Sequence, residues 1–130
     1  MLSRTLLFCP SICKIEYYIL LVDDIASIRK VYIRYLKEQD RLLPIECSNG
    51  KEAVDTYLEK HGQIVAIIMD MQMPVLNGAD ATKQIRESEE NGIDPPYIVG
   101  LSGEELSGDK GLQRYFDEFC IKPISKQKFQ

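Results

Sequence analysis

The sequence contains few of the residues from which metal and redox sites are commonly built. It has a single histidine, His61, and four cysteines. The cysteines, Cys9, Cys13, Cys47 and Cys120, do not stand at the spacing of a zinc site or of a redox pair. We therefore expect no Cys/His metal site. We expect Cys47 and Cys120 to be buried strand residues in a protein of a reducing compartment.

Positive charge and long apolar runs are also scarce. Sixteen Lys and Arg residues stand against 20 Asp and Glu residues, which gives a net charge of -4. Because no basic stripe stands out, binding to nucleic acid would gain little from the release of counterions. No apolar run approaches the roughly 20 residues that a membrane-spanning helix needs. We expect neither nucleic acid nor a membrane as a partner.

Five apolar segments predict the strands of a parallel sheet. They are continuous rather than alternating, as in strands that helices cover on both faces. The five segments are Tyr17–Val22, Leu43–Cys47, Ile64–Met69, Tyr97–Leu101 and Phe119–Ile121. Helical patterns lie between them at Ile28–Tyr35, Ala53–Leu58 and Ala79–Ile85. Strands that alternate with helices over this length predict one doubly wound α/β domain.

Turn residues mark the points where two of these helices begin. Asn49-Gly50 stands before the segment Lys51–Lys60, and Asn77-Gly78 stands before Ala79–Glu87. Asn and Gly favour the backbone angles of turns. We therefore expect the chain to turn at these two dipeptides and to enter a helix directly afterwards.

Polar residues follow four of the predicted strands. They are Asp23 and Asp24, Asp70, Ser102, and Lys122 followed by Pro123. Because ligands of open α/β sheets bind at the carboxyl ends of the strands, we expect these residues to form one site. Three carboxylates in one small pocket repel each other unless a cation or protons compensate them. Oxygen ligands of this kind fit Mg²⁺, which often shares its coordination shell with a phosphate.

Each of these residues also has a simple structural interpretation. Asp24 alone can be the N-cap of the following helix. Ser102 alone can belong to a turn or cap, and Lys122-Pro123 alone can be a turn. As a set they indicate phosphoryl chemistry, because the carboxylate of Asp70 can accept a phosphoryl group as an acyl phosphate. Lys122 would then supply a positive charge and Ser102 a hydrogen bond to the phosphoryl oxygens.

The order of these residues resembles the receiver domain of two-component response regulators. The resemblance covers Leu20–Pro123. Its most specific part, Met69–Gly78, is close to the phosphorylation-site signature of that family, above all in hybrid histidine kinases and phosphorelays. The family fold implied is a flavodoxin-like, doubly wound five-stranded parallel sheet in the order 2-1-3-4-5. Residues 16–130 would form the receiver domain, and residues 1–15 an N-terminal extension.

The resemblance implies a role for each residue of the site. Asp70 would be the phosphoacceptor, Lys122 would bind the phosphoryl group, and Ser102 would be the switch hydroxyl. Phe119 would be the aromatic switch residue, and Pro123 would follow a cis peptide bond. In the Mg²⁺ site, Asp24, Asp70 and the backbone carbonyl of Gln72 would bind the ion directly, and Asp23 would act mainly through a coordinated water.

The function implied by the resemblance is that of a phosphorylation switch. Asp70 would accept a phosphoryl group from a histidine kinase or a histidine phosphotransfer protein, and the affinity for partners would change. Such a domain catalyses its own phosphorylation and dephosphorylation without being a conventional enzyme. The alternative is a pseudo-receiver that binds partners without phosphorylation. A phosphatase of the haloacid dehalogenase type would need an aspartate where this chain has Gln72.

The two ends of the chain carry further expectations. Only Ile124–Gln130 follow Pro123, which predicts a truncated C-terminal helix of about two turns and a partly uncovered sheet face. Either the apolar residues within Met1–Lys14 cover that face or a terminal helix has been lost. A plain extension is favoured over a transit peptide for the same segment. Any dimer would use the incomplete C-terminal surface, and we expect a cytoplasmic protein, with the nucleus or an organelle as alternatives.

Overall fold

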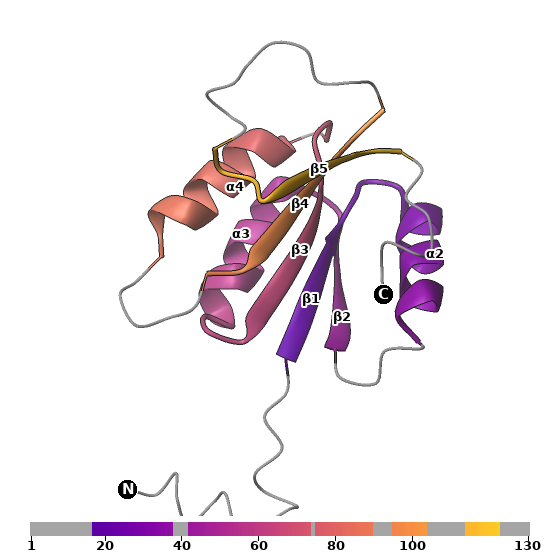
Figure 1. The fold of residues 1–130 in the computed structure, drawn as a ribbon, viewed down its shortest axis with the longest axis horizontal. Coiled ribbons are helices and arrows are strands. Elements are labelled where there is room, and N and C mark those ends of the chain that lie inside the picture. Colours follow the sequence, from indigo (N-terminus) through magenta and orange to yellow (C-terminus); the bar gives the residue numbers. More distant parts are fainter. Residues whose placement is uncertain (1–16, 38–41, 74, 90–94, 104–113, 123–130) are drawn as a thin grey trace, which may run out of the picture.

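A five-stranded parallel sheet with helices on both faces forms the body of the protein (Figure 1). The computed structural model describes residues 17–37, 42–73, 75–89, 95–103 and 114–122. The strands are β1 (Tyr17–Val22), β2 (Leu42–Cys47), β3 (Ile64–Asp70), β4 (Tyr97–Ser102) and β5 (Glu118–Ile121). The helices described are α2 (Ala26–Leu36), α3 (Gly50–Glu59) and α4 (Gly78–Glu87). The order β2-β1-β3-β4-β5 confirms the predicted doubly wound fold.

Several expectations fall on segments outside these described residues. They concern the N-terminal extension, the shortened C-terminal helix and the peptide bond that joins Lys122 to Pro123, and they stay predictions. In the part of the chain that the structure describes, no helix has the length and apolar character needed to cross a bilayer.

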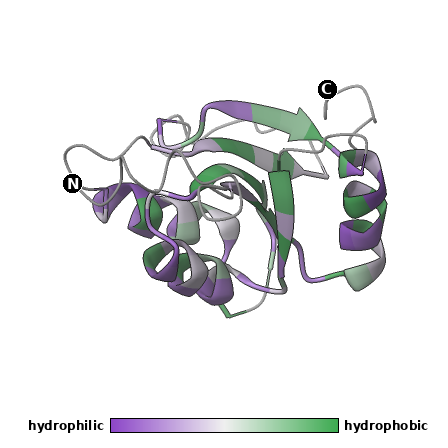
Figure 2. Ribbon diagram, turned by 90° about the horizontal axis from the view of Figure 1, so that it is seen from below, coloured by the Kyte–Doolittle hydropathy of each residue, from purple (hydrophilic) through white to green (hydrophobic). Residues whose placement is uncertain are grey.

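The core consists of two apolar layers, one on each face of the sheet. Successive side chains of β1 alternate between the layers, because neighbouring residues of a strand point to opposite faces. Leu20 belongs to the layer under α3 and α4, and Leu21 belongs to the layer under α2. Both side chains are fully buried. Strand β1 is therefore apolar throughout, and the helices turn their polar sides outward (Figure 2), as the sequence predicts.

Helices α3 and α4 begin where the sequence predicts, whereas α2 lacks the N-cap that the sequence allows. Asn49 caps α3 and Asn77 caps α4, each through a side-chain oxygen that accepts a backbone N–H three residues later. Helix α2 has Ile25 at its N-cap, and no side chain caps it. The interpretation of Asp24 as an N-cap is therefore wrong, because the helix begins one residue later than that role requires.

The two cysteines within the described strands are free thiols. Cys47 is 1% exposed in β2, and burial raises the pKa of its thiol to about 11. Cys120 is only half-buried and lies in β5, an edge strand of the sheet. The prediction of burial is thus confirmed for Cys47 and met in part for Cys120.

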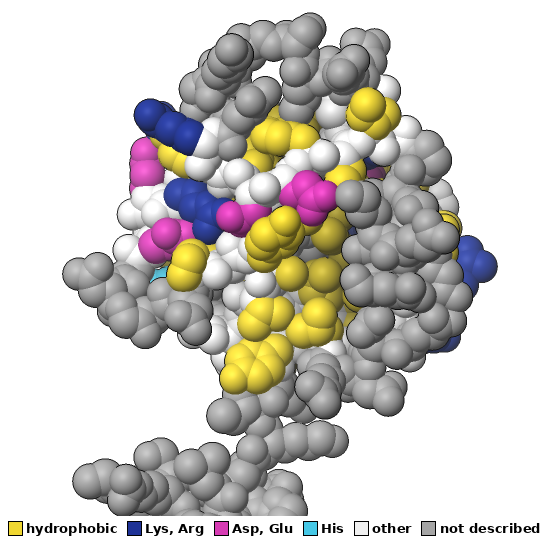
Figure 3. All heavy atoms as spheres, in the orientation of Figure 1, with side chains coloured by type: hydrophobic (Ala, Val, Ile, Leu, Met, Phe, Trp, Pro, Cys, Tyr) yellow, Lys and Arg dark blue, Asp and Glu magenta, His cyan; other side chains and the backbone are white. Residues whose placement is uncertain are grey.

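Apolar side chains lie exposed over the strands on one face of the molecule (Figure 3). Tyr17 at the start of β1 is 42% exposed, and Tyr97 at the start of β4 is 50% exposed. The segments that the sequence connects with an uncovered face, residues 1–14 and 124–130, lie outside the described residues. The way in which they relate to this face stays a prediction.

Candidate functional site

The register of the sheet brings the predicted polar residues to one edge. Val22 of β1 pairs with Met69 of β3, so Asp23 and Asp70 follow side by side. Asp70 pairs with Leu101 of β4, which Ser102 follows directly. Ser102 pairs with Ile121 of β5, which Lys122 follows directly. The backbone N–H of Lys122 also donates to the Ser102 carbonyl at 2.8 Å. Four residues from four parts of the chain thus meet at the carboxyl ends of the strands.

Asp23, Asp24 and Asp70 form an acidic cluster at this edge. Each offers a carboxylate oxygen, and these oxygens lie within 4.8 Å of one another. Asp23 is 1% and Asp70 is 3% exposed, whereas Asp24 is exposed. A divalent cation would relieve the repulsion between three carboxylates at this distance, and carboxylate oxygens are the ligands that Mg²⁺ prefers. The residues present therefore fit the cation that the sequence predicts.

Lys122 neutralises part of the charge of the cluster. Its Nζ lies 3.0 Å from Oδ1 of Asp70 and 3.4 Å from Oδ2 of Asp23. Burial by itself lowers the pKa of Lys122, but the hydrogen bond to Asp70 and the charges of both carboxylates outweigh burial and raise that pKa. The ammonium group is therefore charged at neutral pH, and it lies where it can bind an anionic oxygen next to Asp70.

Asp23 is the carboxylate that burial affects most clearly. Burial is the largest cause that raises its pKa, and the charge of Asp70 adds to it. A hydrogen bond from the Ile25 N–H at 2.9 Å and the charge of Lys122 act in the opposite direction. The net result is a raised pKa, so the ionised form of Asp23 costs folding free energy unless a cation compensates it.

The start of α4 packs directly against the end of β3. The N–H of Gly78 donates to the Met71 carbonyl at 3.3 Å. A Cβ atom at Gly78 would lie 2.1 Å from the backbone oxygen of Asp70, so only glycine allows this approach. The sequence indicates Gly78 as a turn residue, and only the packing shows that it touches the Asp70 backbone.

Gln72, Ser102 and Phe119 also lie around Asp70 or on the neighbouring strands. The backbone N–H of Gln72 donates to Oδ1 of Asp70 at 3.2 Å. Ser102 is 7% exposed at the end of β4. The ring of Phe119 in β5 is half-buried and lies against Phe116, with ring centroids 4.7 Å apart. The ligand role of the Gln72 carbonyl and the switch roles of Ser102 and Phe119 stay predictions.

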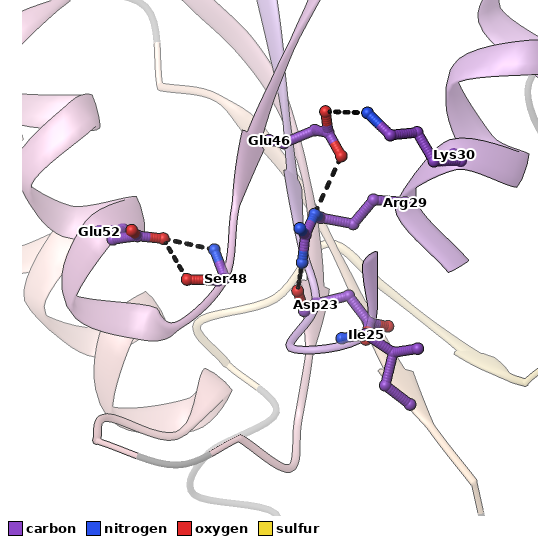
Figure 4. A network of polar contacts seen from close by, with 7 residues as sticks. All are labelled: Asp23, Ile25, Arg29, Lys30, Glu46, Ser48 and Glu52. Atoms are coloured by element: carbon purple, nitrogen blue, oxygen red, sulfur yellow. Dashed lines mark hydrogen bonds and ion pairs between the residues drawn. The ribbon is translucent and has the colours of Figure 1, made fainter. Parts of the chain in front are cut away.

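A charged network beside the acidic cluster has no counterpart in the sequence analysis. Arg29 of α2 donates from Nη1 to the Asp23 carbonyl at 2.5 Å. Its Nε also lies 3.1 Å from Oε1 of Glu46 in β2. Figure 4 shows this chain of contacts from Glu46 through Arg29 to Asp23. No local motif marks these residues, because they become neighbours only when α2 packs beside β2.

Comparison with known protein families agrees with this arrangement. A model of the response regulator receiver domain matches residues 19–130. This chain belongs to the receiver domain family. The resemblance that the sequence suggests is thereby confirmed, and the fold and the acidic cluster are those of a signal-transduction domain of two-component systems.

The receiver domain is similar to part of a longer curated protein. It is 32% identical over 113 residues to the transcriptional regulatory protein ResD of Bacillus subtilis. The aligned part covers 87% of this chain and 45% of ResD. The chain therefore spans less than half the length of this relative, and the likeness concerns the receiver part alone.

Two solved structures are similar to this receiver domain in fold and sequence. One is the receiver domain of sensor histidine kinase PA1611 from Pseudomonas aeruginosa, with a magnesium ion coordinated in its active site cleft. It is 31% identical, with a TM-score of 0.73 and coverage of 88% of this chain and 92% of that chain. The other is the co-crystal structure of the Saccharomyces cerevisiae histidine phosphotransfer protein Ypd1 with the receiver domain of Ssk1. It is 27% identical, with a TM-score of 0.74 and coverage of 87% and 83%.

Proposed function

We propose that this receiver domain is a switch that accepts a phosphoryl group on Asp70. The observation that carries the proposal is the contact of 3.0 Å between Lys122 Nζ and Asp70 Oδ1, beside the carboxylates of Asp23 and Asp24. A carboxylate nucleophile, a positive charge and a set of metal ligands are the parts that phosphoryl transfer requires. They meet here at one edge of the sheet.

In the proposed reaction an oxygen of Asp70 attacks the phosphorus atom of a phosphohistidine. A P–O bond to Asp70 forms, and the P–N bond breaks, so that its electron pair leaves with the imidazole, which takes up a proton. Water later attacks the acyl phosphate, which regenerates Asp70 and releases inorganic phosphate. A Mg²⁺ ion held by Asp23, Asp24, Asp70 and the Gln72 carbonyl would neutralise charge on the phosphoryl oxygens.

The phosphoryl group would act as a switch because it gives nearby residues a new partner. Lys122, which lies between Asp70 and Asp23, would bind a phosphoryl oxygen. The Ser102 hydroxyl would move toward the phosphoryl group and donate to another of its oxygens. The Phe119 side chain would change its position together with Ser102. These contacts would favour one of two arrangements of the neighbouring loops and so change the affinity for a partner.

We infer that the phosphoryl donor is a histidine kinase or a histidine phosphotransfer protein. The similarity to a co-crystal structure of such a phosphotransfer protein with a receiver domain supports this inference. The surface supports it as well, since Ile25 is 48% exposed at the start of α2, directly after Asp24. An exposed apolar side chain next to the acidic cluster offers a contact for a docked partner. A cytoplasmic location and a dimer through the C-terminal surface belong to the same proposal.

The experiment that tests the proposal is phosphorylation of the full chain by acetyl phosphate, with and without Mg²⁺. A phosphate-affinity gel separates the phosphorylated form, and Asp70→Asn is the control. We expect a retarded band that requires Mg²⁺ and is absent from the variant. If the folded wild-type protein takes up no phosphoryl group, the proposal fails and the alternative of a pseudo-receiver is supported.

A further inference from the structure

The backbone of Asp23 is held from the end of β2 in two ways. Its N–H donates to the Cys47 carbonyl at 3.1 Å. Its carbonyl accepts the hydrogen bond from Arg29 Nη1, while Arg29 Nε contacts Glu46, the residue before Cys47. Strand β2 therefore holds Asp23 once directly and once through the Arg29 side chain, and Figure 4 shows the second of these connections.

The loop that carries Asp23 and Asp24 needs such support. Both carboxylates lie close to Asp70, and like charges at this distance push the loop away from β3. The following helix does not supply the support through a side-chain cap, because Ile25 at its N-cap has none. Among the described residues, Lys122 contacts the Asp23 carboxylate from outside the loop, and the Arg29 side chain donates a hydrogen bond to the carbonyl of the same residue.

The contact between Arg29 and Glu46 is better shielded than an ordinary surface ion pair. The Arg29 side chain is 13% exposed, and the Glu46 side chain is 29% exposed. Glu46 also binds Lys30 through its second oxygen at 2.9 Å. Hydrogen bonds from Lys30 and Arg29 lower the pKa of Glu46. Because two nitrogens of one planar guanidinium are engaged, its orientation toward the Asp23 carbonyl is fixed.

We propose that Arg29 is a positioning residue that holds Asp23 and Asp24 in the geometry that binds a divalent cation. Glu46 in turn holds Arg29 in place. The inference rests on the metal site of the proposed function, and it adds two residues that do not contact the metal themselves. Residues that orient metal ligands commonly change metal affinity by about 10- to 100-fold. We expect a change in metal affinity at the lower end of this range, because Arg29 acts through the backbone of Asp23.

Titration with Mn²⁺ tests this proposal, because the paramagnetic resonance signal of the free ion measures binding directly. The variants are Arg29→Met, Arg29→Lys and Glu46→Gln. The matched control is Arg34→Met, since Arg34 is an exposed arginine of the same helix. All proteins are titrated in full-length form at a temperature where circular dichroism shows them folded.

The expected order of Mn²⁺ affinities follows from the contacts. Arg29→Met should weaken binding about tenfold, and Glu46→Gln should weaken it by a smaller factor. Arg29→Lys should restore part of the affinity, because an ammonium can still donate to the Asp23 carbonyl but cannot present the planar fork. Arg34→Met should bind Mn²⁺ like the wild type.

Other outcomes separate this inference from the proposed function. Equal affinities in the wild type, Arg29→Met and Glu46→Gln would overturn the positioning role while leaving the metal site intact. An equal loss in Arg34→Met would also overturn it, because the effect would then come from the charge of the helix. A folded wild-type protein that binds Mn²⁺ no better than Asp70→Asn would overturn the metal site itself. Because Glu46→Gln keeps Arg29, it tests the proposal even if Arg29→Met does not fold.

Discussion

Nζ of Lys122 lies 3.0 Å from Oδ1 of Asp70. The side chain that would bind the phosphoryl group is thus already the counterion of the proposed phosphoacceptor. This contact offsets part of the cost of burying Asp70, whose side chain is 4% exposed. It also means that Lys122 can reach an oxygen bound to Asp70 with only a small movement.

Replacement of Asp23 by asparagine should stabilise the metal-free protein. Since the pKa of Asp23 is raised above 3.8 by burial and by Asp70, its contribution to stability is present below pH 3.8 and is lost as the pH rises through the raised pKa. At pH 7 in EDTA, Asp23→Asn should raise the free energy of unfolding in urea by up to about 1 kcal/mol. Mg²⁺ should stabilise the wild type more than the variant. A variant less stable than the wild type in EDTA would contradict this account.

Replacement of Gly78 by alanine should destabilise the fold near Asp70. The added Cβ would meet the Asp70 backbone oxygen at 2.1 Å, and a forced contact of this kind costs about 1–3 kcal/mol. Gly103→Ala is the matched control, because a Cβ at Gly103 meets no atom within 4 Å. Urea denaturation of both variants measures the difference. Equal stabilities would show that α4 can move away from β3 at little cost.

Arg86 should be the most important charged residue for the stability of the β4 and β5 side of the sheet. Its guanidinium donates to the carbonyls of Tyr115 at 2.8 Å and Pro96 at 3.0 Å, and it contacts Asp117 at 2.7 Å. Because Arg86→Ala leaves the Tyr115 and Pro96 carbonyls without this donor, we expect a loss of about 1–3 kcal/mol. Lys83→Ala, whose ion pair with Glu87 is exposed at 4.0 Å, should change the stability by less than about 0.5 kcal/mol. A similar loss in both variants would argue against this role.

The stabilisation that Glu46 provides should disappear in acid. Hydrogen bonds from Lys30 and Arg29 lower its pKa below 4.5, so its contribution is present above pH 4.5 and is lost as the pH falls through the lowered pKa. Because the groups are partly exposed, the difference between wild type and Glu46→Gln should stay below about 1 kcal/mol at neutral pH. Urea unfolding over a series of pH values measures it. A difference that persists in acid would indicate a packing effect instead of a charge effect.

Ile25 should affect transfer from a protein donor but not from acetyl phosphate. Ile25→Ser removes an apolar side chain that is 48% exposed beside the acidic cluster, and serine is a good N-cap, so folding should not suffer. We expect the rate of transfer from a phosphorylated histidine phosphotransfer protein to fall about tenfold, which corresponds to about 1.4 kcal/mol. Leu58→Ser is the control, since Leu58 is 50% exposed on α3. An equal effect of both variants would exclude a specific docking role for Ile25.

The strand predictions succeeded because burial on both faces makes a strand apolar throughout. Strands β2 and β5 begin one residue earlier than predicted, at Leu42 and Glu118, and strands β3 and β4 end one residue later, at Asp70 and Ser102. Apolar character ends before these polar residues, but the backbone pairing continues, since Asp70 pairs with Leu101 in β4. The end of a strand is therefore set by its neighbours, and the hydrophobic pattern alone cannot place it.

Asp23, Asp70, Ser102 and Lys122 could be found because each follows directly after an apolar segment, whereas the roles of Gln72 and Phe119 come only from the resemblance to the family. The residues that support the site could not be found in this way. Arg29 contacts Glu46 across 17 positions of the chain, and Arg86 contacts Asp117 across 31 positions. A surface arginine and a bridging arginine look alike in the sequence, because the partners of both depend on how helices pack against strands.

The alternation of buried strands with amphipathic helices can be derived from the amino-acid sequence alone. From this alternation follow the doubly wound sheet and the edge at which Asp23, Asp70, Ser102 and Lys122 gather. These features follow from hydrophobicity and position along the chain, which are local properties. The folded structure is needed to see which charges meet, how closely Gly78 approaches Asp70, and that Arg29 donates a hydrogen bond to the Asp23 carbonyl. These contacts depend on strand register and helix packing, since distances of a few ångströms between remote residues exist only after the whole sheet has assembled.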